Sequence, residues 1–523
     1  MKKILLTLLL VPFAGFAQQF QWLKTPAVSM PYNSDLVGYP NTVDPQGNVY
    51  VSGYKDNHYI YNSIMGNVSL TKYAPDGFEF YNQTLIGKVQ VHRLCADGNG
   101  NVYAAISYLN TLSVGELVFE NNFQSEVYLL LKFDQNGNPL WYKHFTPFDY
   151  GDGFYNEITE LRAMTIDNTG KLYLGYADFM QSIIEEINPE NGTTIRSINQ
   201  GDVRRVTSLA TDNQGNLYAT GSCAGNSARY NNTPAGTSLQ YNDYIVKYAP
   251  DFSFQWVKYI EDITCSTPEV AAKSEDEIYF AGTQFAATSF DNITTEGPLY
   301  GMDDFFLAKL NHNGEYQWVR EVNGGGAFIL GNRNFLAVDP IGNVYVSGRS
   351  RFDINWGNGF TSGTGAYTYD ATLVKYDPEG NTQMVKTAPS QIMSRFDSVA
   401  IANSNDVYCS GMGFGFMSID TISYDPGQIS AAYPFVTKLE QTIAGNTNPK
   451  AKMPVLYPNP ATNILYLKGI TQNTSAEIYN MLGQQVVVAA ISPGQPLNIS
   501  ALQTGSYVLK LNNSNPIKFI KLD

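Results

Sequence analysis

Acidic and aromatic side chains are concentrated in residues 144–160 of the sequence. The candidate ligand-binding residues in this segment are Asp149, Asp152, Glu157, Glu160 and Tyr155. Carboxylates are the ligands that Ca²⁺ prefers, and aromatic rings stack on sugars, so the segment could bind a calcium ion or a glycan. The simpler interpretation is a solvated acidic loop, because the spacing of an EF-hand is missing. Apart from this candidate Ca²⁺ site, we predict no cofactor.

The residues that a nucleophilic or zinc-dependent enzyme needs do not form a recognisable pattern. The four histidines are His58, His92, His144 and His312, and neither G-x-S-x-G nor H-E-x-x-H occurs. The four cysteines lack C-x-x-C spacing. We therefore assign no catalytic residue. A glycosidase with two carboxyl groups stays open, since carboxyls about 5 to 10 Å apart can come from distant parts of a chain.

Composition limits the class of partner. The chain has 523 residues and a formal net charge of -14, without a run of Lys or Arg, which argues against nucleic acid or an anionic membrane as partner. Only 15% of residues are charged, whereas Tyr (36), Phe (28) and Gly (45) are abundant. This composition is typical of many short strands joined by tight turns.

The first 17 residues have the pattern of a Sec signal peptide. Lys2 and Lys3 are followed by an apolar run over Ile4–Phe16, and the small residue Ala17 precedes the expected cleavage point. The run is about 13 residues, too short to span a bilayer. We expect removal of residues 1–17 and no membrane span; an uncleaved anchor is the less favoured alternative.

A hairpin pattern recurs along the chain as Asp-x-x-Gly-Asn-x-Tyr. An Asp that accepts backbone N–H bonds and a Gly with positive φ predict a tight turn between two strands. Seven tyrosines mark seven units: Tyr50, Tyr103, Tyr173, Tyr218, Tyr279, Tyr345 and Tyr408. A second hairpin follows in each unit, marked in six of them by Lys72, Lys132, Lys247, Lys309, Lys375 and Lys438, and Ile187–Gly192 fills the remaining place.

Two hairpins per unit predict a four-stranded antiparallel blade, and seven blades predict a β-propeller over residues 18–440, in which ring closure removes exposed sheet edges. The last unit lacks its fourth strand. Phe20–Lys24 matches Phe254–Lys258 almost letter for letter, so we expect the N-terminal strand to close the last blade. Over residues 20 to 440 the units resemble the SBBP-type β-propeller repeat, a likeness of fold that says little about ligand.

The predicted connections differ between the two ends of the blades. The turns within each hairpin are tight and lie at one end, while the connections between hairpins are long and lie at the other, where we expect function. Calcium binding by the repeated Asp turns is the weaker explanation of that motif, because hairpin chemistry accounts for its recurrence. Cys223 and Cys265 both fall at the long-connection end of neighbouring blades, so a disulfide between them is a candidate, whereas Cys95 and Cys409 are expected to be buried free thiols.

The C-terminal part differs from the repeats. Residues 441–454 are predicted to be a linker, and short alternating strands over residues 455–523 predict a small antiparallel β-sandwich. The motif residues here are Tyr457, Pro458, Asn459, Pro460, Gly483, Gly505, Tyr507 and Lys521. Over residues 452–523 they resemble the type A sorting domain of the type IX secretion system of Bacteroidetes. The resemblance implies recognition by the outer-membrane translocon, followed by release or attachment to the cell surface.

Three hypotheses follow for function. The leading one is a secreted or cell-surface propeller that binds an extracellular glycan or protein without catalysis. The alternative is a secreted polysaccharide hydrolase or lyase that uses carboxylates on the long-connection face. A structural adhesion protein is the third, and the sequence does not identify the ligand.

Overall fold

The computed structural model describes residues 17–26, 38–56, 58–60, 63–123, 125–145, 148–149, 155–156, 158–264, 266–298, 304–322, 325–363, 368–402, 406–427, 432–442, 455–468, 473–480, 484–511 and 517–522. The predicted signal peptide lies outside these residues, except for Ala17. By contact density the chain divides into two compact units, one of residues 18–441 and one that includes residues 442–523. Within the described ranges we find no helix with the length and hydropathy needed to cross a membrane.

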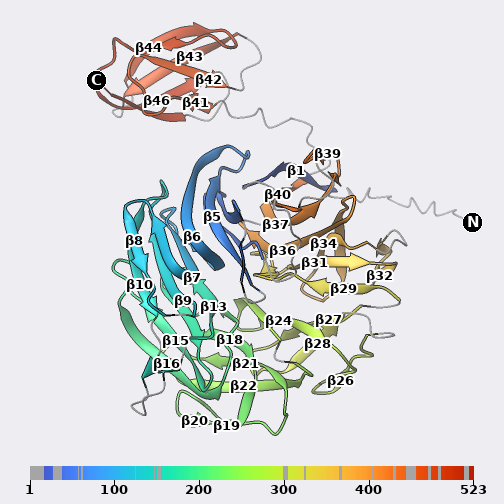
Figure 1. The fold of residues 1–523 in the computed structure, drawn as a ribbon. Helices are drawn as coiled ribbons and strands as arrows, with labels where there is room; N and C mark the ends of the chain where they lie inside the picture. The colour runs from blue at the N-terminus through green and yellow to red at the C-terminus, as the bar shows by residue number, and fades with distance from the viewer. Residues whose placement is uncertain are drawn as a thin grey trace, which may run out of the picture. The chain divides into compact units, whose positions relative to one another are not determined.

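The prediction of an all-β fold is confirmed, and residues 18–441 form a seven-bladed β-propeller. In Figure 1 the blades follow one another round a ring. Blade 1 consists of β2 (Asn41–Val43), β3 (Val49–Tyr54), β5 (Ser63–Tyr73) and the first half of β6 (Glu79–Ala96). Blade 2 consists of the second half of β6, β7 (Val102–Val114), β9 (Val127–Phe133) and β10 (Pro139–Phe145). Blade 3 consists of β13 (Glu160–Ile166), β14 (Leu172–Ala177), β15 (Gln181–Ile187) and β16 (Thr194–Val203). Blades 4 and 5 consist of β17 (Ser208–Thr211), β18 (Leu217–Ser222), β21 (Asn242–Tyr248) and β22 (Phe254–Glu261); and β23 (Glu269–Ser274), β24 (Glu277–Gln284), β27 (Asp304–Leu310) and β28 (Tyr316–Arg320).

Blade 6 has two short innermost strands, β29 (Ala327–Leu330) and β30 (Leu336–Val338), followed by β31 (Val344–Arg351), β34 (Asp370–Tyr376) and β35 (Thr382–Ala388). Blade 7 consists of β36 (Met393–Ile401), β37 (Asp406–Phe414), β40 (Ala432–Thr442) and β1 (Ala17–Lys24). The two ends of the propeller chain thus share one sheet, as Figure 1 shows for β1 and β40. Thr437 Oγ1 donates a hydrogen bond of 2.6 Å to the carbonyl of Trp22.

Several connections that the sequence left as loops contain short hairpins. They are formed by β4 (His58–Ile60) with β5, β8 (Leu117–Glu120) with β7, β11 (Phe148–Asp149) with β12 (Tyr155–Asn156), β19 (Ala224–Tyr230) with β20 (Thr233–Pro234), β25 (Ser289–Phe290) with β26 (Ile293–Thr294), β32 (Ile354–Gly357) with β33 (Phe360–Ser362), and β38 (Met417–Ile419) with β39 (Ile422–Tyr424). Blades 1 and 2 are joined by β6 itself, a single strand of 18 residues rather than a loop. Gly87 lies within β6 where the strand leaves blade 1 for blade 2, with a φ of 146° and a register shift beside it. A Cβ at this position would lie 2.3 Å from the carbonyl oxygen of Thr111, so only glycine fits.

The repeated Asp residues hold the hairpin turns, and Tyr50, Tyr279 and Tyr408 link a hairpin to the next blade. In blade 1, Asp44 Oδ1 accepts the backbone N–H of Asn48 at 2.8 Å, and Oδ2 accepts the hydroxyl of Tyr50 at 3.0 Å. The same hydroxyl lies 2.7 Å from the carbonyl oxygen of Gly100 in blade 2. Tyr408 of blade 7 makes the equivalent bond of 2.7 Å to the carbonyl of Gly47 in blade 1. These bonds give the repeated Asp and Tyr residues a structural role, which accounts for the recurrence of the motif.

The repeated Lys and Trp residues also link neighbouring blades. Lys132 Nζ and Trp141 Nε1 both donate to the carbonyl of Pro189 in the next blade, at 2.8 and 3.0 Å. In blade 4 a register shift in the outer hairpin lets Phe254 and Trp256, two residues apart, pack against opposite neighbours. A partly buried Trp ring and a hydrogen bond to a backbone carbonyl thus hold blade 2 to blade 3, and Trp256 and Trp318 make the same bond from blades 4 and 5.

The C-terminal unit is a sandwich of two sheets. One has the order β41 (Val455–Tyr457), β42 (Ile464–Lys468), β45 (Leu497–Asn498), and the other the order β44 (Gln485–Ile491), β43 (Thr474–Asn480), β46 (Gly505–Leu511), β47 (Ile517–Lys521). Alternation along the strands places Leu465 and Leu467 inside and Ile464 and Tyr466 outside. The core of this unit includes Leu465, Ile478, Leu509 and Phe519.

Candidate functional site: a charged cluster on the axis of the propeller

Charged side chains from six blades meet where the innermost strands begin. We call them the axial cluster: Arg93, Arg162, Arg205, Arg333, Arg395, Glu160, Glu269 and Asp397. Each innermost strand runs from a long connection to a tight turn, so the cluster lies toward the long-connection end, where we expected function. Blades 2 to 7 each contribute at least one residue to the cluster.

Two ion pairs cross between blades in this cluster. Arg93 Nη1 of β6 lies 2.8 and 2.9 Å from the two carboxylate oxygens of Glu269 on β23, and the carboxylate of Glu269 is fully buried. Glu160 at the start of β13 accepts bonds of 2.8 and 3.2 Å from Arg205, which precedes β17. Arg162 lies 3.8 Å from the same carboxylate. Glu160, a predicted ligand residue, is therefore held by two arginines.

Arg333 differs from the other arginines of the cluster. Its residue is only 6% exposed, and Nη1 donates to the carbonyl of Asn332 at 2.9 Å. Nε and Nη2, which form the edge that binds a carboxylate through two parallel bonds, have no hydrogen-bond partner among the described residues. Oδ2 of Asp397 is also buried without a described donor, while Oδ1 accepts Arg395 Nε at 2.9 Å. Burial lowers the pKa of Arg333 to about 10, so it stays charged at neutral pH.

The cluster carries an excess of positive charge. Five arginines and three carboxylates give a formal charge of +2. Two further acids lie nearby, Asp243 beside Arg205 and Glu126 beside Tyr54, but burial raises the pKa of both carboxyl groups, which favours their neutral forms. In a chain with a formal charge of -14, this region is therefore suited to an anionic group.

A histidine and a serine lie together beside the cluster. His92 Nε2 is 2.8 Å from Ser107 Oγ. Burial lowers the pKa of His92 well below its ordinary value, and Arg333 and Arg162 lower it further. Ser107 is fully buried. Because a nucleophile must reach its substrate, this pair is better explained as packing.

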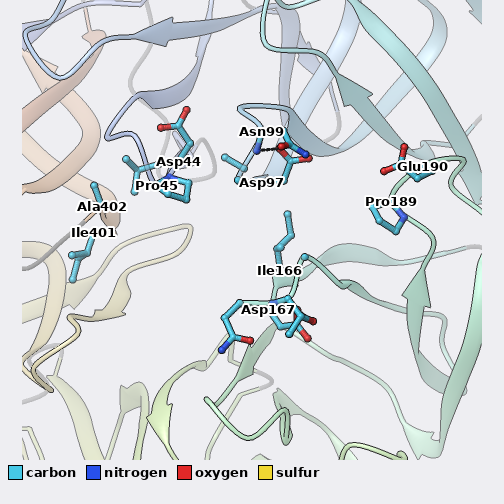
Figure 2. Close-up of a pocket in the computed structure, with 16 residues that line it drawn as sticks. Asp44, Pro45, Asp97, Asn99, Ile166, Asp167, Pro189, Glu190, Ile401 and Ala402 are labelled. Carbon is cyan, nitrogen blue, oxygen red and sulfur yellow. Dashed lines mark hydrogen bonds between the residues drawn. The ribbon is translucent and has the colours of Figure 1, made fainter. Parts of the chain in front are cut away.

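A hollow of about 620 Å³ lies at the opposite, tight-turn end of the blades. Figure 2 shows it bordered by residues of blades 1, 2, 3 and 7, including Asp97, Asp167 and Glu190. The aspartates are engaged in their own turns: Asp97 Oδ1 accepts the N–H groups of Asn99 and Asn101, both at 2.9 Å. Most of the carboxylate oxygens that border this hollow are already bonded within the turns.

The predicted acidic segment is only partly described. Asp152 and Glu157 lie outside the described residues, and Asp149 and Tyr155 are paired backbone positions of β11 and β12 whose side chains are not described. The suggestion of a ligand site there stays a prediction. Among the described residues no group of three or more His, Cys, Asp or Glu side chains is placed to hold a metal ion.

The cysteines fall into two kinds. Cys95 and Cys409 are free thiols, half-buried and buried, and burial raises the pKa of both. Cys223 is disulfide-bonded. Cys265 lies outside the described residues, so the pairing of Cys223 with Cys265 stays a prediction. His312 is exposed in a turn and bonds to Asp276.

The motif residues of the C-terminal unit occupy different environments. Tyr507 and Lys521 are buried, whereas Tyr457 and the segment 458–460 are exposed. Gly505 has a φ of 156°, and Gly483 lies outside the described residues. Some motif residues therefore contribute to the core of the domain, whereas others face solvent.

Apart from Glu160, the residues of the axial cluster were missed by sequence reasoning. Its arginines and carboxylates lie outside the repeated Asp, Tyr and Lys positions, and its partners are as far apart as Arg93 and Glu269. The available signal was weak: a charged residue near the start of an innermost strand, where the repeats otherwise carry apolar or small residues.

Comparison with known proteins identifies the C-terminal unit. The profile of the secretion system C-terminal sorting domain matches residues 455–522. The chain thus ends in a type IX secretion system sorting domain, which directs export to the cell surface or the extracellular space. No curated protein matched the chain.

Solved structures similar to the chain share little sequence with it. They include PorZ, a surface component of the type IX secretion system of Porphyromonas gingivalis (10% identity, 92% of this chain and 70% of that chain, TM-score 0.28). Others are the Dos1 propeller (7%, 81% and 95%, TM-score 0.36) and a catalytically inactive virginiamycin B lyase from Staphylococcus aureus with quinupristin (11%, 80% and 99%, TM-score 0.37).

Proposed function

We propose that the propeller is a non-catalytic module that binds an extracellular ligand at the axial cluster, and that this ligand is an acidic glycan. The observation that carries the proposal is the excess of arginine over carboxylate in the cluster, together with the edge of Arg333, which is buried without a partner and would bind a ligand once the residues that cover it move aside. A guanidinium edge binds a carboxylate through two parallel, charge-assisted hydrogen bonds. A sugar acid offers that carboxylate, and its hydroxyls could donate to Oδ2 of Asp397.

The state of the cluster's carboxylates supports binding rather than catalysis. A catalytic acid or base needs a carboxyl group that can exchange a proton with substrate. The carboxylates of Glu160 and Glu269 are each already engaged in an ion pair with arginine. A protein ligand with exposed acidic side chains is the other occupant that this chemistry admits.

The experiment compares binding and turnover on one acidic and one neutral polysaccharide. Polygalacturonate and dextran are titrated into the purified protein by calorimetry, and product release is followed on both. We expect binding of polygalacturonate, no binding of dextran and no products. Arg333→Gln should weaken binding about tenfold or more, since a hydrogen bond to a charged group contributes about 1.5–3 kcal/mol. Arg229→Gln, an exposed arginine of β19, is the matched control and should bind normally.

Three results would contradict the proposal. Turnover that is lost on a single Asp or Glu substitution would favour the hydrolase or lyase hypothesis. Equal binding by the Arg333 and Arg229 variants would place the ligand elsewhere. Firm retention on the cell surface without binding of either polysaccharide would favour the adhesion hypothesis.

A further inference from the structure

The motif residues of the sorting domain separate into those that build the fold and those that face solvent. Tyr507 is 8% exposed, stacks on Phe519 with ring centroids 5.7 Å apart, and donates its hydroxyl to the carbonyl of Gln503 at 2.8 Å. Lys521 is 4% exposed and belongs to β47. Burial and hydrogen bonding explain why the fold needs these two residues. They do not explain Tyr457.

Tyr457 takes part in an exposed aromatic stack. It pairs with Tyr466 across β41 and β42, with ring centroids 5.5 Å apart and an interplanar angle of 20°. The two residues are 48% and 36% exposed, and Ile464, two positions along β42, is 43% exposed. Large apolar side chains that gather on a surface commonly mark an interaction site. We call Tyr457, Ile464 and Tyr466 the Tyr457 face.

The outer face of the other sheet has a different character. Val486, Val488 and Ile520 are 41%, 61% and 41% exposed there. Val486 and Val488 are neighbours on β44, and Glu477 and Lys510, in register with Val488, separate it from Ile520. Scattered apolar residues among charges are ordinary surface. Among the described residues of this domain, the Tyr457 face is thus the better candidate for docking.

The segment that follows Tyr457 is tied to the last strand of the domain. Asn459 Oδ1 accepts the backbone N–H of Ile520 at 2.9 Å, and Asn459 Nδ2 donates to the carbonyl of Lys518 at 3.3 Å. Ala461 donates its N–H to the carbonyl of Ile520 at 2.9 Å and accepts the N–H of Leu522 at 2.7 Å. The first motif and the C-terminal strand therefore form one unit, in which Asn459 is a positioning residue for the Tyr457 face.

We propose that the Tyr457 face is the surface through which the sorting domain docks on a protein component of the secretion machinery. The choice of partner rests on the family match, since residues 455–522 are the part of the chain that belongs to a secretion sorting domain. The character of the surface agrees with it: tyrosine is enriched in protein interfaces, where its rigid ring supplies contact area and its hydroxyl a hydrogen bond. This docking is independent of what the propeller binds.

The test follows export of the full chain in a bacterium that has the type IX system. The double variant Tyr457→Ala/Tyr466→Ala removes both rings, and we expect the exported fraction to fall at least about tenfold, as for loss of an aromatic hot spot. Tyr457→Phe/Tyr466→Phe keeps the stack and should restore export. Val488→Ala, an exposed apolar residue on the opposite sheet, is the matched control and should be exported normally.

Folding of the sorting domain is measured separately, so that loss of export is not confused with loss of structure. Each variant is purified and its thermal unfolding and protease resistance are compared with wild type; we expect no change for the double alanine variant. Export of that variant at the wild-type level would overturn the proposal, and so would an equal defect in Val488→Ala. Asn459→Ala should reduce export while the domain stays folded, with Tyr507 buried, which is measured as unchanged protection of the domain against protease. Normal export of this variant would show that Asn459 does not position the Tyr457 face.

Discussion

The closure of the ring by a terminal strand makes Trp22 the most informative residue for stability. Trp22 is 9% exposed and packs against Tyr73 and Tyr408, with ring centroids 6.3 and 6.0 Å away. Its Nε1 donates to the carbonyl of Pro75 at 3.0 Å. These contacts hold β1 against blade 1, and within blade 7 the pairing of β1 with β40 closes the ring without a covalent connection between the two strands.

We expect Trp22→Ala to lower the free energy of unfolding by about 4–6 kcal/mol. Truncation of a buried Trp costs about 3–5 kcal/mol, and the lost indole hydrogen bond adds about 1 kcal/mol. This is about a quarter or more of a typical stability of about 5–15 kcal/mol. Because β1 is held at its N-terminal end only by such contacts, the variant should also expose residues 17–24 to protease under native conditions.

Trp256→Ala is the matched control. Trp256 Nε1 donates to the carbonyl of His312 at 2.9 Å, and its ring lies 6.3 Å from that of Tyr218. Its strand, β22, is continuous with the chain at both ends, so the substitution removes similar contacts without releasing a terminus. Urea unfolding followed by fluorescence, with limited proteolysis, measures both effects. An unchanged midpoint for Trp22→Ala, or equal protection of residues 17–24 in both variants, would refute closure by β1. Deletion of Phe20–Lys24 should destabilise the propeller still further.

Three further outcomes are expected. Deletion of residues 455–523 should leave the propeller folded, because its core clusters contain no residue of the tail, and should stop export, measured as loss of the protein from the surface and medium. Peptide mapping without reduction should link Cys223 to Cys265 and find Cys95 and Cys409 alkylatable once unfolded; any other pairing would contradict the prediction. Burial raises the pKa of Asp304 to about 7, above its unfolded value, so its carboxyl destabilises the fold by about 4 kcal/mol as pH rises from about 4 to above 7. Asp304→Asn should flatten this part of the pH profile of urea unfolding, and an unaltered profile would exclude Asp304 as its source.

Local chemistry made much of the fold readable from the sequence. An Asp that bonds the N–H group four residues on, as Asp44 does with Asn48, depends only on neighbours in the chain, and the same turn recurs at Asp212 and Asp339. Seven recurrences of a local unit implied a ring, since open blades would leave exposed edges. The sorting domain was recognisable for the same reason: its motifs are continuous stretches of sequence, and the family match covers them.

Connections were less predictable. The sequence indicated a break between blades 1 and 2, whereas β6 passes through both, because Gly87 adopts a conformation and a close backbone approach that a residue with a Cβ would resist. The length of a segment that connects two blades does not show whether the segment forms a loop or a strand shared by both blades.

The candidate site and the docking surface were decided only by tertiary structure. Arg93 and Glu269 lie 176 positions apart and meet because the ring brings blades 2 and 5 to a common axis. Nothing in the types or spacing of the residues distinguishes Arg333, whose guanidinium edge is unengaged by described residues, from Arg395, which is paired. Likewise Tyr457 and Tyr507 are motif tyrosines of one domain, and only the packing of the two sheets exposes one and buries the other. Sequence alone determined the repeated hairpins and the export address, because short-range hydrogen bonds and continuous motifs carry them; charge and exposure at a site depend on which distant surfaces the ring and the sandwich bring together.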